Sequence, residues 1–166
     1  MKSLRNRFSQ LIRFFYRVDI VILSVVLLSC SPIHPDRAEL VVGKASGEEI
    51  DINVALAVSP AEKRSGLPQI DAIGFNEGTL LIYGADKYIS LTMRGARNDI
   101  STAFLDSSGV IKEIYNMIID PNVVYRSSEK NRYALQMAIG WFDDNGVNAG
   151  DQIILPPEIR KIKPLL

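Results

Sequence analysis

The residues of this chain best suited to hold a ligand are arginines and a short Tyr-Arg-Ser run. A guanidinium group binds a carboxylate or phosphate through two parallel hydrogen bonds, and neighbouring hydroxyl groups add further donors. We predict a binding site for a small anionic ligand at Arg94, Tyr125, Arg126 and Ser127, with Arg97 nearby. The alternative interpretation is that these arginines are solvated on the surface of a sheet, which is the commoner environment of arginine.

The distribution of histidine and cysteine excludes the commonest catalytic mechanisms. The chain has one cysteine, Cys30, and one histidine, His34, and both lie near its N-terminus. The rest of the chain therefore lacks the usual general base at neutral pH and the usual thiol nucleophile. Zinc sites draw on the same two residue types. We predict no catalytic residue, no metal site and no cofactor.

The N-terminal segment has the features of a bacterial lipoprotein signal peptide. Basic residues precede the apolar run 20–28, and Leu27-Leu28-Ser29 supplies a cleavage site before Cys30. We therefore predict a signal peptide over residues 1–29 and a mature chain that begins at lipidated Cys30. The two alternatives are a transmembrane helix, which needs about 20 apolar residues, and a buried core helix.

Lipidation of Cys30 would attach the protein to a membrane of the bacterial cell envelope. Ser31 directly after the lipidated residue favours the outer membrane, with the domain facing the periplasm. Residues 1–29 hold five of the 19 Lys and Arg residues and one of the 19 Asp and Glu residues, so the mature chain carries 14 minus 18 charges, or −4. This acidic balance argues against nucleic acid as a partner, because nucleic-acid binding depends on clustered cations.

Carboxylates are the groups that remain available for catalysis. A hydrolase acting on envelope polymers would need two carboxylates about 5 to 10 Å apart in a cleft. The candidates are Asp99 or Asp106, paired with Asp120. This enzyme is the alternative to our first hypothesis, a non-catalytic domain that binds a small ligand or an envelope protein. The third hypothesis is a structural role, which a contiguous exposed apolar patch would favour.

The elements that must position these residues are short strands joined by turns. Residues 50–58 alternate with a period of two, and Ser46-Gly47 joins them to the apolar run 39–43 as a hairpin. Further strands are predicted at 79–83, 88–93, 102–105, 110–117, 133–137 and 152–155, with a turn at Asp106-Ser107-Ser108-Gly109 and a loop that begins at Asp120 and includes Tyr125. Short helices are predicted at 60–65, where Ser59 and Glu62 form a capping pattern, and at 141–145. Helices this short are not expected to build parallel crossovers.

These elements predict a mainly β fold, an antiparallel β-sandwich or distorted barrel with two short helices. The domain would span residues 39–157, after a tether at 30–38, and a tail would follow at 158–166. The sequence leaves open whether this tail packs against the domain.

The order of several short motifs resembles the DUF192 family, also called UPF0127, over roughly residues 39 to 155. The motifs are Glu62-Lys63-Arg64-Ser65-Gly66-Leu67, Gly78-Thr79-Leu80-Leu81-Ile82-Tyr83, Met93-Arg94, Ala103-Phe104-Leu105-Asp106, Tyr125-Arg126-Ser127-Ser128, Tyr133-Ala134-Leu135, Gly140-Trp141 and Gly150-Asp151. The resemblance implies a compact β-rich fold that is frequently exported in bacteria and has no established biochemical activity.

The chain departs from the family pattern at three places. Gly95 stands where the family usually has asparagine, Ser101 where it has the aspartate of a Pro-Leu-Asp stretch, and Gln136 where it often has glutamate. If those carboxylates bind or catalyse in relatives, this chain has lost or altered that role.

Overall fold

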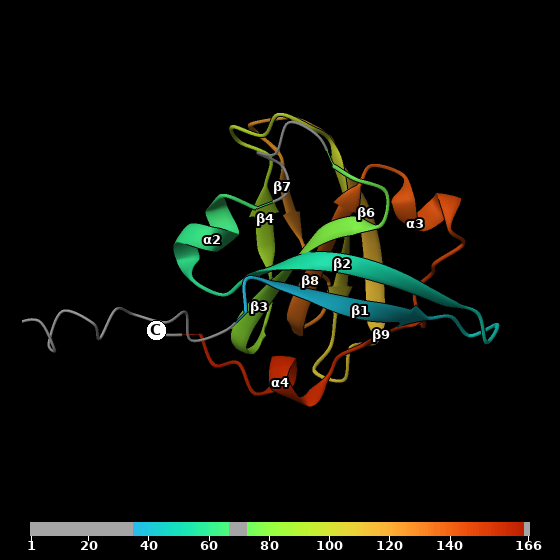
Figure 1. The fold of residues 1–166 in the computed structure, drawn as a ribbon. Helices are drawn as coiled ribbons and strands as arrows, with labels where there is room; N and C mark the ends of the chain where they lie inside the picture. The colour runs from blue at the N-terminus through green and yellow to red at the C-terminus, as the bar shows by residue number, and fades with distance from the viewer. Residues whose placement is uncertain (1–34, 67–72, 165–166) are drawn as a thin grey trace, which may run out of the picture. The chain divides into compact units, whose positions relative to one another are not determined.

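The computed structural model describes residues 35–66 and 73–164. The predicted signal peptide, the lipidation site Cys30 and most of the predicted tether therefore lie outside the described residues. The elements are β1 (Arg37–Gly43), β2 (Glu49–Ala57), α2 (Pro60–Arg64), β3 (Glu77–Lys87), β4 (Ser90–Thr92), β5 (Ile100–Leu105), β6 (Ile111–Met117), β7 (Val124–Arg126), β8 (Asn131–Ala138), α3 (Trp141–Asp144), β9 (Gln152–Ile154) and α4 (Pro157–Arg160) (Figure 1).

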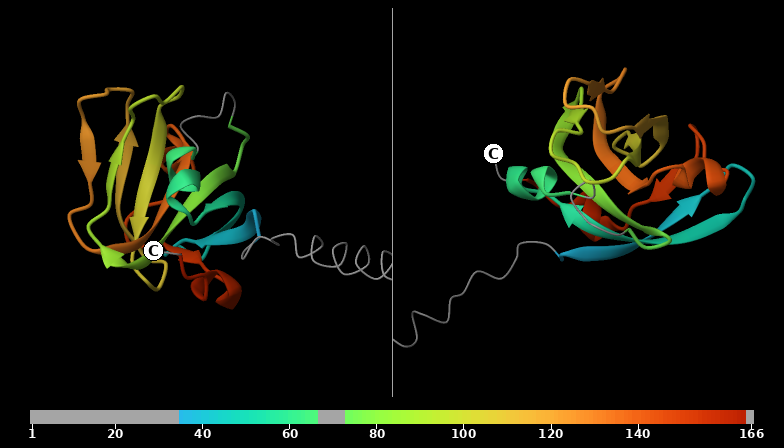
Figure 2. Two further views of the ribbon diagram at one scale, coloured as in Figure 1. Left: turned by 90° about the vertical axis from the view of Figure 1, so that its left-hand side faces the viewer. Right: turned by 90° about the horizontal axis from the view of Figure 1, so that it is seen from above.

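The described strands form one large sheet and one small ribbon. The large sheet has seven strands in the order β6-β5-β8-β3-β2-β1-β9, and the ribbon pairs β4 with β7. The large sheet curls strongly when seen from above (Figure 2). Its two ends meet through a bridge between Val110 and Gln152, and the Ile153 N–H donates to the Gly109 carbonyl at 2.8 Å. The predicted mainly β class with a distorted barrel is confirmed.

The turn between β5 and β6 is shaped for this closure. The Asp106 carboxylate accepts from the N–H groups of Ser108 (2.9 Å) and Val110 (3.1 Å) and from the Ser108 hydroxyl (2.6 Å). Partial burial opposes ionisation, but these bonds outweigh it and keep the pKa of Asp106 below its ordinary value. Gly109 has a φ of +92°, and a Cβ there would lie 2.3 Å from the Ile153 carbonyl oxygen. Glycine is therefore required at this position.

One strand pair differs from the all-antiparallel sheet that the sequence predicts. Strands β2 and β3 run parallel, with Ala55 opposite Thr79. Parallel neighbours need a crossover of a dozen residues or more. Residues 58–76 supply it, with α2 as the helix within it. The short predicted helices argued against parallel pairs, but the length of the whole connection, and not of the helix alone, decides whether the chain can cross over.

The helix predicted at 60–65 is present as α2, and its start follows the predicted capping pattern. The Ser59 hydroxyl accepts from the Glu62 N–H at 3.2 Å, and the Glu62 carboxylate accepts from the Ser59 N–H at 2.7 Å. Pro60 occupies the first helical position, where a missing N–H costs nothing.

Each described helix is too short to cross a membrane.

The C-terminal tail packs against the domain as far as the structure describes it. Pro156 caps α4, an element that the sequence analysis did not predict, and Ile159 in this helix is buried. Ile162 then packs against the main apolar cluster. Strand β7 is the second addition, because its residues were expected to form a loop.

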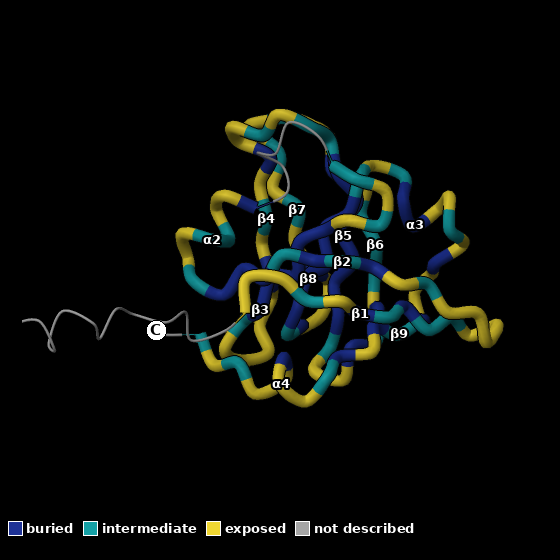
Figure 3. The backbone as a smooth tube through the Cα atoms, viewed as in Figure 1, coloured by how far each residue is buried: buried dark blue, intermediate teal, exposed yellow. Residues whose placement is uncertain are grey.

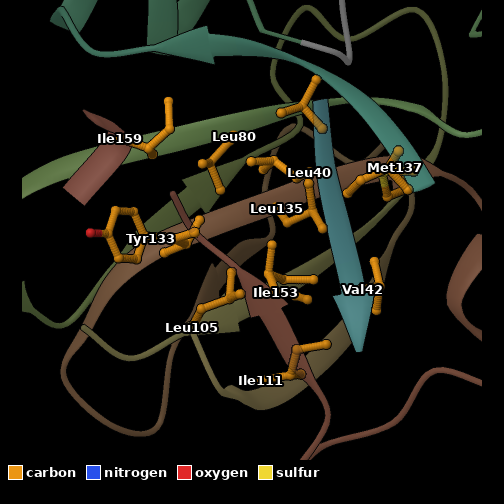
Figure 4. Close-up of a cluster of buried hydrophobic side chains, with 14 of the residues drawn as sticks. Leu40, Val42, Leu80, Leu105, Ile111, Tyr133, Leu135, Met137, Ile153 and Ile159 are labelled. Atoms are coloured by element: carbon orange, nitrogen blue, oxygen red, sulfur yellow. The ribbon is translucent and has the colours of Figure 1, made fainter. Parts of the chain in front are cut away.

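The main apolar cluster fills the inside of the curled sheet. Buried side chains run along β3, β5 and β8, the middle of the sheet (Figure 3). Side chains of alternate residues point inward from several strands and meet at the centre (Figure 4). They include Leu40, Val42, Leu80, Leu105, Ile111, Leu135, Met137 and Ile153. The inside of the sheet is therefore a packed core, and polar groups that could bind a ligand must lie elsewhere.

We predict that Gly109→Ala destabilises the protein by about 3 kcal/mol or more, because strain at positive φ adds to a clash with a backbone oxygen. Gly47→Ala is the matched control, since Gly47 also has a positive φ (+87°) but nothing within 4 Å of its added Cβ. The control should lose about 1 to 2 kcal/mol. Chemical denaturation measures both values, and equal losses would show that the closing contact with Ile153 is unimportant.

Candidate functional site

The β4–β7 ribbon carries two of the four residues predicted to bind a ligand, Tyr125 and Arg126, and the other two directly follow its strands or lie in the next turn. Its pairs are Ser90 with Arg126, Leu91 with Tyr125 and Thr92 with Val124. Leu91 and Tyr125 point toward the large sheet, where they pack against the cluster of Met93, Ile100 and Met117. The ribbon thus covers the outer face of the sheet, opposite the main core.

Tyr125 and Arg126 lie on opposite sides of this ribbon, as neighbours in a strand must. The Tyr125 ring packs edge-on against Tyr115, with ring centroids 6.3 Å apart, and its hydroxyl accepts from the Ile118 N–H at 3.0 Å. The exposed Arg126 guanidinium instead lies 5.1 Å from the centre of the Tyr88 ring. The two side chains therefore cannot grip one ligand together.

Ser127 holds the ribbon in place. Its buried hydroxyl accepts from the Ile89 N–H at 2.9 Å and donates to the Glu129 carbonyl at 2.8 Å. Arg94 is exposed in the turn after β4, and its backbone N–H donates to the Thr92 hydroxyl at 3.3 Å. Since the four predicted residues do not present one common face, their geometry lends no support to an anion site, and the site stays a prediction.

A row of buried polar side chains lies on the outer face of the sheet, the face that the ribbon packs against. Thr79 on β3 is opposite Gln136 on β8, which is opposite Thr102 on β5. Their exposed fractions are 3%, 4% and 0%. We call these three residues the polar row. It runs across the sheet between two apolar clusters, one built around Leu81 and Phe104 and the other around Ile100.

Two oxygen atoms of the polar row lack a hydrogen-bond partner among the described residues. They are Thr102 Oγ1 and Gln136 Oε1, which belong to residues directly opposite each other on neighbouring strands. An unpaired buried polar group costs about 1 to 3 kcal/mol, so such groups are normally satisfied by protein, ordered water or a ligand. A third such atom, Asn131 Oδ1, lies at the start of β8, away from the row.

Tyr115 lies next to the polar row, but its hydroxyl proton is donated to a neighbouring carboxylate. It lies opposite Thr102 on β6, and its hydroxyl donates to the Glu113 carboxylate at 3.1 Å. That hydrogen bond is the main reason why the pKa of Tyr115 is raised, and desolvation and the Glu113 charge act in the same direction. The hydroxyl therefore stays protonated at neutral pH and remains a hydrogen-bond donor.

The sequence analysis singled out Gln136 but missed its two threonine neighbours. The signal that could have identified them is the alternation of strand residues. It places Thr79 on the same face of its strand as Leu81, and Thr102 on the same face of its strand as Phe104. Polar residues on the same side of their strands as these large apolar residues are expected to be buried. The register that aligns them across three strands could not be predicted from local sequence.

Ser101, another departure from the family pattern, lies on the opposite side of the sheet from Gln136. It pairs with Met137, whose side chain belongs to the main core. Its hydroxyl donates to Asn116 Oδ1 at 2.5 Å and accepts from the Gly140 N–H at 2.9 Å. The serine is therefore satisfied by its own neighbours, and the two departures do not belong to one site.

The carboxylates proposed for a hydrolase accept hydrogen bonds from backbone N–H groups. Asp106 and Asp120 bind their own turns, at the N–H groups of Val110 (3.1 Å) and Asn122 (2.8 Å). Asp99 accepts from the Ile119 N–H at 2.7 Å, so it lies beside the segment that carries Asp120. Within residues 35–66 and 73–164, no three His, Cys, Asp or Glu side chains gather where they could hold a metal ion.

We predict that Ser127→Ala lowers the free energy of unfolding by about 2 kcal/mol, because the buried Ile89 N–H loses its hydrogen-bond acceptor. The Glu129 carbonyl keeps a partner, since the Asn131 side chain also donates to it at 3.0 Å. The neighbouring exposed Ser128→Ala is the control, with a change within about 0.5 kcal/mol. Urea denaturation of both variants measures these changes. A loss of stability for Ser127→Ala as small as that for Ser128→Ala would show that the Ser127 hydroxyl does not hold the ribbon in place.

Comparison with known proteins places this geometry in a family. Residues 41–155 match the model of the DUF192 family, which is described as an uncharacterized ACR. No curated protein matches the chain.

Two solved crystal structures share the fold. One is a proposed transcription regulator from Sinorhizobium meliloti 1021, 24% identical, with a TM-score of 0.69 over 74% of this chain and 96% of that chain. The other is a protein of unknown function from Novosphingobium aromaticivorans DSM 12444, 17% identical, with a TM-score of 0.67 over 76% of this chain and 94% of that chain. The fold and the family match, which extends over most of the sequence, lead to one conclusion: the chain belongs to the DUF192 family.

Proposed function

We propose that this protein is a lipid-anchored lipoprotein of the bacterial cell envelope whose domain binds a small ligand without catalysing a reaction. The observation that carries the binding proposal is the pair of oxygens without a partner among the described residues, Thr102 Oγ1 and Gln136 Oε1, which belong to buried residues opposite each other on the outer face of the sheet. The anchor rests on the sequence, in which an apolar run and a cleavage motif precede Cys30.

The chemistry of the polar row defines the class of ligand. An amide oxygen such as Gln136 Oε1 can only accept a hydrogen bond, whereas the Thr102 hydroxyl can donate or accept. A ligand with an N–H or O–H group satisfies both oxygens. A carboxylate or phosphate offers acceptors alone and does not suit Gln136 Oε1. We therefore replace the anionic ligand of the sequence prediction by a small amine, amide or alcohol.

The flanking apolar clusters indicate that the ligand also has an apolar part. Leu81 and Phe104 lie on one side of the polar row and Ile100 on the other. Binding sites for small molecules commonly combine apolar walls with a few polar groups that fix orientation. The hydrolase is not proposed further, because Asp99, Asp106 and Asp120 each accept hydrogen bonds from backbone N–H groups and so have a structural role.

One structural neighbour is named as a transcription regulator, but we do not propose that role for this chain. The mature form of this chain would carry 14 basic and 18 acidic residues, a balance that does not favour binding to nucleic acid. The envelope location proposed here also separates the domain from the chromosome.

The binding proposal predicts that the double variant Thr102→Val/Gln136→Leu loses the ligand but not the fold. Removing unpaired polar atoms while keeping their volume should leave stability unchanged or raise it by about 1 to 2 kcal/mol. Each protein is purified from its host and denatured, and the small molecules that the original protein and the variants release are compared by mass spectrometry. Thr102→Ser keeps the hydroxyl and serves as the control, which should retain the molecule. If the original protein releases no molecule that the double variant lacks, the binding proposal fails.

The anchor predicts a mature chain that begins at Cys30 and carries added acyl mass. Intact mass spectrometry of the detergent-extracted protein measures this directly. Cys30→Ala should abolish both cleavage and acylation, because the lipid is attached to the thiol. An unprocessed chain that begins at Met1 would overturn the anchor and leave Cys30 as a free thiol.

A further inference from the structure

Cationic side chains gather at one end of the domain. Lys63 of α2 and Lys87 at the end of β3 lie 4.7 Å and 5.4 Å from the centre of the Tyr83 ring. Next to Lys87 on β3, Asp86 pairs with Arg132 of β8 at 2.8 Å. This end comprises α2 and the end of β3, at the left of the domain in Figure 1, and α4 below them. We call it the basic end, and its cations are Lys63, Arg64, Lys87, Arg132, Arg160, Lys161 and Lys163.

The last described residues, 161–164, add two lysines to the basic end. Residues 161–164 return from α4 toward β3, where Pro164 Cδ would lie 3.8 Å from a Cβ added to Gly84. Lys161 and Lys163 are exposed on this segment, as is Lys87 on β3. Exposed lysines on separate elements therefore share one surface.

The charge of the basic end is opposite to that of the rest of the mature chain. Its seven cations are accompanied by four acidic residues, Asp36, Glu62, Asp86 and Glu158, so its net charge is +3. The mature chain as a whole has 14 basic and 18 acidic residues. The remainder therefore has seven basic and 14 acidic residues, a net charge of −7. The protein is a strong electrostatic dipole whose positive pole is the basic end.

The chain enters the domain at this same end. The Asp36 carbonyl accepts from the Leu56 N–H at 2.9 Å, and Arg37 at the start of β1 is opposite Ala55 near the end of β2. Arg37 is seven positions after Cys30, so the chain between them spans at most about 25 Å. The tip of the β1–β2 hairpin at Ser46 is about 20 Å or more farther along β1.

We propose that the basic end docks on the anionic phospholipid headgroups of the membrane that holds Cys30. This inference rests on the proposed lipid anchor and adds an orientation to it. A lysine or arginine near an anionic bilayer strengthens binding by about fivefold, over a range set by the Debye length of about 10 Å. The tether lets the basic end come within that range, while the acidic remainder is repelled. In this orientation the basic end faces the bilayer, and the tip of the β1–β2 hairpin points away from it.

The test uses the full chain purified from its host, with the acyl mass on Cys30 verified, reconstituted in phosphatidylcholine vesicles with or without phosphatidylglycerol. A fluorophore is attached at Ala85→Cys, on the basic end, or at Ser46→Cys, on the hairpin tip; both positions are exposed. A headgroup-linked quencher reports proximity to the bilayer. Quenching at residue 85 should rise severalfold when phosphatidylglycerol is present and fall at high salt, and quenching at residue 46 should stay low.

Two charge variants separate docking from a general effect of charge. Lys87→Gln/Lys161→Gln/Lys163→Gln should remove the response at residue 85. The matched control Arg94→Gln/Arg97→Gln/Lys130→Gln changes the net charge equally at positions outside the basic end and should keep the response. Equal melting temperatures exclude unfolding as the cause.

The outcomes distinguish this inference from the anchor. Acyl mass on Cys30 with equal quenching at residues 85 and 46, or with no response to phosphatidylglycerol, overturns docking and leaves the anchor intact. A response that the matched control also loses overturns docking by the basic end. A chain without acyl mass overturns both proposals.

Discussion

The meeting of the two sheet ends at Gly109 and Ile153 is the constraint on which the rest of this domain depends. Strand β9 pairs with β1 on one side and touches the β5–β6 turn on the other. This contact curls seven strands around one apolar cluster. Asp106 shapes the turn through its hydrogen bonds, and Gly109 brings the backbone close enough for the Ile153 N–H to reach it. A residue with a side chain at this place would hold the sheet open.

Closure of the sheet also decides where a ligand can bind. The inside of the curl is filled by side chains, as in other small barrels, so it offers no room for a polar molecule. The middle strands have a second face, and the ribbon covers it by means of Leu91, Tyr125 and the Ser127 hydroxyl. The polar row lies on that second face. The fold thus separates a stabilising apolar inside from an outer layer that holds the polar row.

Local sequence signals predicted the local structure well. The turn at Ser46-Gly47, the cap formed by Ser59 and Glu62, and the turn at Asp106 are all present, because each depends on neighbouring residues. The parallel β2–β3 pair and the sheet closure escaped prediction, since each joins segments far apart in the sequence. The site prediction depended on one missed element. Once residues 124–126 form a strand instead of a loop, Tyr125 and Arg126 must face opposite ways.

The pairing of β1 with β9 has a consequence for how the protein folds. It joins residues 41–43 to residues 152–154, so the contact spans almost the whole domain in sequence. Contacts of such long range slow folding, because a large loop must be ordered before they form. Until β9 is available, one edge of β1 has unpaired backbone groups, and exposed edges favour association with other chains. The first strand of the sheet is therefore protected on both sides only after nearly the whole chain has been made.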